Sequence, residues 1–150
     1  MEERLVKVYF QLEGSDWHNY KTESVWALQL KGDLFQIRNI PTFMYGVSLN
    51  DICFCELKEG GLYYYKYTVK PSGHSTYRIF LPKNFSRQAF EVQWAKMEKF
   101  DCKYEKSTEL LYSVDIPAIS NIYAVYAMLE EGEKNGTWYF EEAHCGHAVN

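Results

Sequence analysis

The hydrophobic pattern of this 150-residue chain changes once, at residues 71–78, whose sequence is Pro-Ser-Gly-His-Ser-Thr-Tyr-Arg. Before this segment, short alternating runs of apolar and polar residues are separated by turn residues, which indicates antiparallel strands. After it, strand-like runs alternate with stretches whose apolar residues recur every three or four positions, as in helices. A Pro/Gly turn at the change of period predicts a boundary. We therefore expect two units, residues 1–72 and 73–150, packed against each other.

The first unit is expected to be a small antiparallel β sheet or barrel. Its apolar runs are short and are joined by tight turns such as Lys31-Gly32-Asp33, which is typical of a hairpin. Five strands are predicted, at residues 5–12, 24–30, 34–40, 51–57 and 62–69.

The second unit is expected to be a ferredoxin-like α+β domain. Strands are predicted at residues 76–81, 101–105, 110–116 and 137–141. The first helix is capped by Asn84 or Ser86, runs to about Lys99, and has an apolar face of Phe85, Ala89, Val92, Lys96 (by its stem), Met97 and Phe100. The second carries the stripe Ile119, Ile122, Val125, Tyr126 and Leu129 and weakens at Gly132. The order βαββαβ predicts a four-stranded antiparallel sheet with two helices on one face.

Composition limits the classes of partner. The net charge of −4 argues against nucleic acid, because phosphate binding needs Lys and Arg, and mildly favours a basic protein. No run approaches the roughly 18 apolar residues of a membrane span, and no apolar leader precedes the first strand. We expect a cytoplasmic protein without membrane contact or cofactor. Its four cysteines, among which Cys53 and Cys55 share one strand face, are expected to be reduced and mostly buried.

The cluster His74, Ser75, Thr76 and Arg78 is the most polar candidate site, with Tyr63 and Tyr65 on the preceding strand. Nucleophilic catalysis needs a hydroxyl, a base and an acid that converge. Neighbours in an extended segment point to opposite faces, so His74 and Ser75 should diverge. The favoured interpretation is a turn in which His74 braces the junction. Binding of a partner or ligand by His74, Arg78 and the tyrosines is the alternative, and catalysis the least favoured one.

Three other groups of residues are candidates. The first group lies at the end of the second helix and consists of Glu130, Glu131 and Glu133. These carboxylates are either solvated or form an acidic docking patch, to which Asp115, Glu141 and Glu142 could add. Trp94 lies among polar residues and is predicted to be an exposed interface anchor, whereas Trp26 and Trp138 are predicted to be core. His144, Cys145 and His147 are possible metal ligands, but a frayed polar tail is favoured because a second anchoring pair is missing.

Several segments carry a resemblance to a family. The segments 6–10, 23–27, 37–41 and 46–51, the motif at 71–78, and the closing runs 129–133 and 138–142 resemble a bacterial family of about this length, catalogued as a domain of unknown function. The resemblance covers nearly the whole chain and implies neither an activity nor site residues. The Tyr63–Tyr65 run and the Cys-containing tail depart from the family's pattern.

Small acidic bacterial proteins of this kind resemble immunity proteins of contact-dependent and other polymorphic toxin systems. That resemblance implies a non-enzymatic protein that binds and neutralises one cognate toxin, often a nuclease, as a monomer within a heterodimer. The alternatives are a small regulatory or ligand-binding module that uses the junction near His74 and Arg78, and a hydrolase that pairs His74 with a distant acid or Cys.

Overall fold

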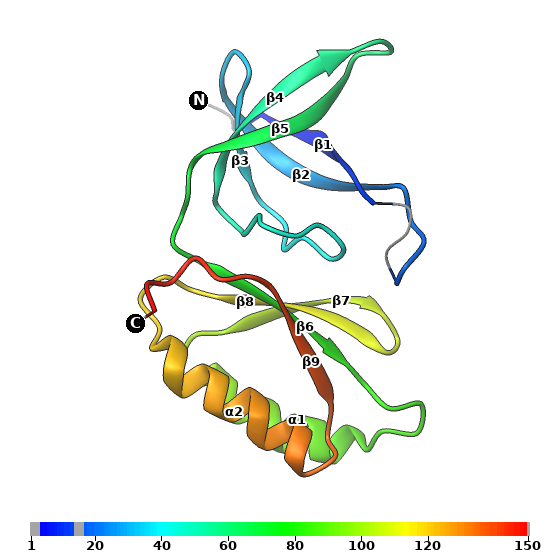
Figure 1. Cartoon of the computed structure of the whole chain (residues 1–150), viewed down its shortest axis with the longest axis vertical. Helices are drawn as coiled ribbons and strands as arrows, with labels where there is room; N and C mark the ends of the chain where they lie inside the picture. The colour runs from blue at the N-terminus through cyan, green and yellow to red at the C-terminus, as the bar shows by residue number, and fades with distance from the viewer. Residues whose placement is uncertain (1–3, 14–16, 150) are drawn as a thin grey trace.

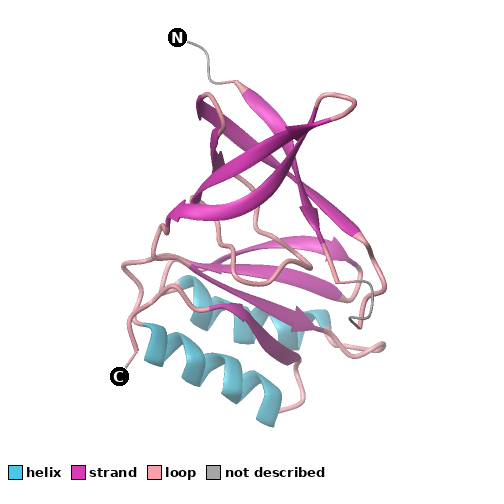
Figure 2. Ribbon diagram, turned by 45° about the horizontal axis from the view of Figure 1, so that its top comes forward, coloured by secondary structure: helices cyan, strands magenta, loops and turns pink. Residues whose placement is uncertain are grey.

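The computed structural model describes residues 4–13 and 17–149, and within these ranges the chain forms nine strands and two helices. The strands divide between a closed barrel and a four-stranded sheet. The barrel lies against one face of the sheet, and both helices cover the opposite face (Figures 1 and 2). The predicted α+β class is confirmed.

The barrel is built from five strands in sequence order, closed by a short parallel pairing between the first and the last. They are β1 (Leu5–Gln11), β2 (Thr22–Lys31), β3 (Leu34–Ile37), β4 (Ile52–Lys58) and β5 (Leu62–Lys70). Alternate residues point inward, so that Val8 and Phe10 of β1 meet Val25 and Ala27 of β2 in the core. Trp26 lies between these two inward residues and therefore points outward, 46% exposed, so its predicted core position is wrong.

The four-stranded sheet has the spatial order β7-β8-β6-β9, and all its neighbouring strands are antiparallel. The elements are β6 (Ser75–Phe80), α1 (Arg87–Glu98), β7 (Lys103–Thr108), β8 (Leu111–Ile116), α2 (Ile122–Lys134) and β9 (Tyr139–His144). β7 and β9 lie two to three residues later than predicted, because each follows a turn that contains a left-handed residue, Asp101 or Gly136.

Helix α1 begins where Ser86 caps it, with the Ser86 hydroxyl accepting a hydrogen bond from the Ala89 amide. Its buried face consists of Phe90, Gln93, Trp94 and Met97. The predicted apolar face is rotated from this one, and Val92 is 60% exposed. Trp94 is only 5% exposed, so its predicted role as an exposed anchor is wrong: the helix turns its bulkiest rings toward the sheet.

Helix α2 is capped by the Asn121 side chain and continues to Lys134, past the predicted weak point at Gly132. Ile122, Val125 and Leu129 are buried as predicted. Ile119 precedes the helix and is 87% exposed, so it does not belong to the buried stripe. Neither helix is long and apolar enough to cross a membrane, within the described part of the chain.

The four cysteines are free thiols. Cys53 and Cys55 point into the barrel and Cys102 lies in the core under the helices. Burial raises the pKa of each of these three thiols to about 12, because a thiolate is poorly solvated there. Cys145 is only partly buried.

This burial predicts selective thiol chemistry. In the folded protein at pH 8, a maleimide should modify Cys145, while Cys53, Cys55 and Cys102 react only after denaturation, because only the thiolate of an accessible cysteine is nucleophilic. Peptide mass spectrometry after a timed reaction gives the extent at each site. Modification of two or more thiols in protein with an unchanged near-UV circular dichroism spectrum would contradict the prediction.

Candidate functional site

The two units meet across a polar junction. β6 sends Tyr77 and Ile79 into the core beneath the helices, and its alternate residues Thr76, Arg78 and Phe80 face the barrel. On the barrel side the junction is formed by the connection 38–51, between β3 and β4. Many of the contacts across it are hydrogen bonds, which require specific partners on both sides.

Arg78 is the central side chain of this junction and is fully buried. Its guanidinium donates to the carbonyl oxygens of Thr42 and Met44, the latter at 3.2 Å, and to Glu141 at 2.5 Å. The ring of Tyr45 lies 4.5 Å from the guanidinium carbon, a cation–π contact. The group proposed from sequence as a partner-binding cation is thus used internally, joining β6 to the connection and to β9.

A second set of contacts joins histidines to hydroxyls. Ser48 Oγ lies 2.6 Å from Thr76 Oγ1 and 2.8 Å from His144 Nδ1. His147 Nε2 lies 2.8 Å from the Pro117 carbonyl oxygen, to which it can only donate, and its Nδ1 lies 2.6 Å from Ser75 Oγ. In the neutral imidazole, Ser75 therefore donates to Nδ1.

These bonds fix the C-terminal segment on the sheet through at least His147. The interpretation of this segment as a frayed polar tail is wrong. The segment also passes so close to the 73–75 turn that a Cβ at Gly146 would collide with the His74 carbonyl oxygen. Among the residues that the structure describes, no three His, Cys, Asp or Glu side chains converge as metal ligands.

His74 pairs with a carboxylate from the sheet. Its Nδ1 lies 2.8 Å from Asp115 Oδ1, and the Asp115 side chain is only 3% exposed. Burial raises the pKa of Asp115, an effect that the hydrogen bond to His74 opposes. The turn before His74 is anchored to a second buried carboxylate, Asp51, which accepts from the amides of Ser48 and Ser72 at 3.0 and 2.8 Å.

An Asp–His pair is half of a nucleophilic triad, but its third member is missing. Ser75 is buried and bonded to His147, and the Ser72 hydroxyl donates to the Leu49 carbonyl oxygen at 2.8 Å. No hydroxyl bonds to His74 Nε2 among residues 4–13 and 17–149. The arrangement can hold and orient an imidazole, and it offers that imidazole no positioned nucleophile in this part of the chain.

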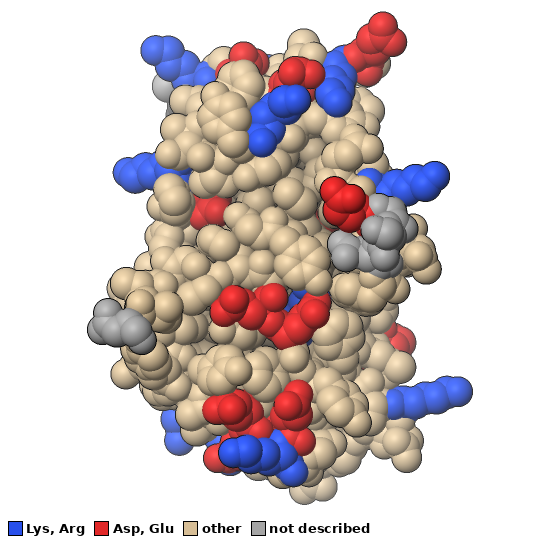
Figure 3. Space-filling model, viewed as in Figure 1, with Lys and Arg blue, Asp and Glu red and all other residues tan. Residues whose placement is uncertain are grey.

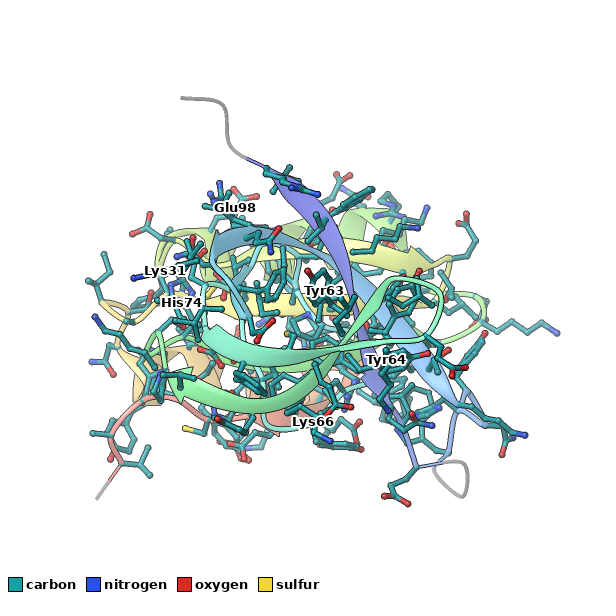
Figure 4. All side chains as sticks on the ribbon, turned by 90° about the horizontal axis from the view of Figure 1, so that it is seen from above. Lys31, Tyr63, Tyr64, Lys66, His74 and Glu98 are labelled. Atoms are coloured by element: carbon teal, nitrogen blue, oxygen red, sulfur yellow. The ribbon has the colours of Figure 1, made fainter. Side chains whose placement is uncertain are left out.

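The tyrosines of β5 divide between two environments. Tyr63 packs on Phe35 at 4.7 Å between ring centroids, and Tyr65 packs on Phe10 at 5.3 Å, both against the barrel core. Tyr64 instead lies beside Tyr9, with the Lys58 ammonium 4.7 Å from its ring centroid (Tyr63 and Tyr64 are labelled in Figure 4). Of this run, the two residues named as candidates contribute mainly to barrel packing.

The acidic residues of α2 lie in two different places. Glu131 faces α1, where its carboxylate pairs with Lys96. Glu130 and Glu133 lie on the other flank with Tyr126, whose ring meets Phe140 of β9 at 5.5 Å. We define the α2–β9 patch as Tyr123, Tyr126, Glu130, Glu133, Phe140 and Glu142. Figure 3 shows carboxylates gathered on this face of the molecule, one group over the sheet and one over α2.

Sequence reasoning placed Asp115 in a possible surface patch, and its 2% exposure makes that wrong. A signal was present: Leu-Tyr-Ser-Val-Asp-Ile, the whole of β8, is buried, and a charged residue within such a strand needs a partner. Sequence patterns identified neither Glu105 nor Glu23 as a candidate residue of the junction. Glu105 accepts from the Ile40 amide at 2.6 Å, and Glu23 accepts from three successive amides of residues 42–44.

Comparison with known proteins gives a family and a fold. The family model DUF4265, described as a domain of unknown function, matches residues 23–140. A solved structure of a hypothetical protein from Neisseria gonorrhoeae is similar over 99% of this chain and 100% of that one, with a TM-score of 0.81 and 22% identity. At that identity the likeness concerns the fold alone. No curated protein matches the sequence significantly.

Proposed function

The chain belongs to the DUF4265 family of domains of unknown function, and on that premise we propose that it is a non-enzymatic binding protein that docks a basic protein partner. The observation that carries this proposal is the α2–β9 patch, where exposed tyrosines alternate with carboxylates. A cognate toxin is the partner class we propose, which makes the chain an immunity protein of the cytoplasm. The strand order β7-β8-β6-β9, with both helices on one face, supports a ferredoxin-like assignment for residues 75–144.

The tyrosines of the patch supply contact area. Tyr123 and Tyr126 are 57% and 42% exposed, and Tyr126 is held in place by its edge-on contact with Phe140. A tyrosine braced in this way loses little conformational entropy on binding, and Tyr is enriched among the residues that dominate interface energies. The patch therefore has the rigid aromatic centre that a specific protein contact needs.

The carboxylates of the patch supply charge selection. Glu130 and Glu133 are exposed and make no ion pair with any residue that the structure describes, unlike Glu131. The acidic excess of the chain also lies mostly in residues 73–150, which hold eleven Asp and Glu against eight Lys and Arg. Unpaired carboxylates around aromatic rings speed association with a basic surface and disfavour an acidic one. A nuclease groove is such a basic surface.

The test is co-expression with the product of the adjacent reading frame. The two proteins should co-purify, and the chain should relieve any growth arrest that the neighbour causes. The double variant Glu130→Lys/Glu133→Lys should raise Kd about tenfold, mainly by slowing association. Glu13→Lys/Glu59→Lys, the same charge change on exposed barrel residues, is the matched control. Failure to associate, or equal affinity for both variants, would refute the assignment.

A further inference from the structure

A polar pocket opens beside His74, which is paired with Asp115. Its volume is about 370 Å³, and it is lined by Gln36, Asn50, Ile52, Lys70, Pro71, Ser72 and His74. These residues come from three barrel strands, from the connection 38–51 and from the turn before β6. The pocket thus lies between the barrel and the turn that leads into the sheet. Its size suits a small metabolite or ion.

The lining is rich in hydrogen-bond donors and contains no carboxylate. The side chains of Gln36, Asn50, Lys70 and His74 all carry N–H groups. Asp51 is the adjacent acid in the sequence, but it is buried and its two carboxylate oxygens are bonded to the backbone amides of Ser48 and Ser72. The negatively charged carboxylate of Asp51 therefore faces these backbone amides in the protein interior. Lys70 is exposed and makes no ion pair within the described residues.

His74 is positioned for the pocket by the carboxylate behind it. Asp115 accepts from Nδ1, so the proton on that nitrogen is fixed and the ring cannot rotate freely. Nε2 makes no hydrogen bond within residues 4–13 and 17–149, and the side chain keeps 17% of its surface exposed. Because Nδ1 already donates to Asp115, Nε2 can donate only from the doubly protonated ring. In that form the ring and Lys70 present two cationic groups to the pocket.

We propose that this pocket binds a small anion through a carboxylate or phosphate group, held between His74 Nε2 and the Lys70 ammonium with the amides of Gln36 and Asn50 beside it. Charge-assisted N–H bonds to an anionic oxygen are the contacts that this donor set makes best. The site is separate from the α2–β9 patch and from the proposed partner, so either can fail without the other.

The probes are inorganic phosphate and sodium acetate, titrated at constant ionic strength with chloride as the balancing ion. Two-dimensional NMR of the full chain should show saturable shifts of the His74 ring and of the Asn50 and Ser72 amides. The probe with the lower Kd identifies the ligand class. His74→Gln and Lys70→Gln should each raise that Kd about tenfold, the loss of one charge-assisted contact.

The matched control is Lys66→Gln, which removes an exposed lysine from the same strand but outside the pocket. It should bind the anion as the native chain does. Lys70→Gln alters an exposed side chain and should fold normally, so it remains informative if the His74 variant is unstable. Shifts that grow linearly with both anions, or an equal Kd for Lys70→Gln and Lys66→Gln, would overturn the proposal.

Discussion

Replacing Arg78 by methionine should lower the free energy of unfolding by about 3 kcal/mol, the cost typical of removing one member of a buried ion pair. Methionine fills much of the same volume, so the loss comes from the polar partners. Two carbonyl oxygens, of Thr42 and Met44, and one oxygen of Glu141 would lose a charged donor that is itself fully buried. Urea denaturation followed by tryptophan fluorescence measures the change.

Two variants separate this effect from general loss of charge. Glu141→Gln keeps an oxygen for the guanidinium and should cost about 1 kcal/mol, because Glu141 is one-third exposed and only the charge is lost. Arg87→Met removes an exposed arginine that bonds the Tyr112 hydroxyl, and it should change stability much less than Arg78→Met. Equal losses for Arg78→Met and Arg87→Met would show that the junction does not depend on the Arg78 contacts.

The local elements were predictable because they depend on neighbours in sequence. Alternation predicted the barrel strands, and Ser86 was one of the two predicted caps of α1. The cap of α2 at Asn121 was not predicted. The predictions were wrong where tertiary packing decides which face of a strand or helix is buried. An aromatic side chain such as Trp26 can occupy a core position. Here its neighbours Val25 and Ala27 point into the barrel, so the alternation of the strand points Trp26 outward.

The junction could not be predicted, because its bonds join residues that are far apart in sequence. His74 meets Asp115 across 41 positions, and Ser75 meets His147 across 72. The sequence argument that His74 and Ser75 diverge is confirmed by these separate partners. The partners themselves cannot be named from sequence, since a histidine beside hydroxyls is compatible with any of several acids in the chain.

Gly132 shows local propensity and tertiary packing in direct conflict. Glycine within a helix costs about 1 kcal/mol relative to alanine, so propensity alone predicts that Gly132→Ala stabilises α2. Yet Gly132 is buried against Trp138, and an added Cβ would lie 2.5 Å from Nε1 and 2.7 Å from Cζ2 of the indole. The Trp138 ring cannot easily move, because it is 1% exposed and its Nε1 donates to the Leu129 carbonyl oxygen at 3.0 Å.

We therefore expect Gly132→Ala to destabilise the chain by about 2 kcal/mol, a steric cost of about 3 kcal/mol less the gain in propensity. The matched control is Ala127→Gly, the reverse exchange at an exposed position of the same helix, which should cost about 1 kcal/mol. Denaturant midpoints of both variants give the comparison. Stabilisation by Gly132→Ala would mean that the indole can leave its site, and that glycine here follows from something other than the close approach of α2 to Trp138.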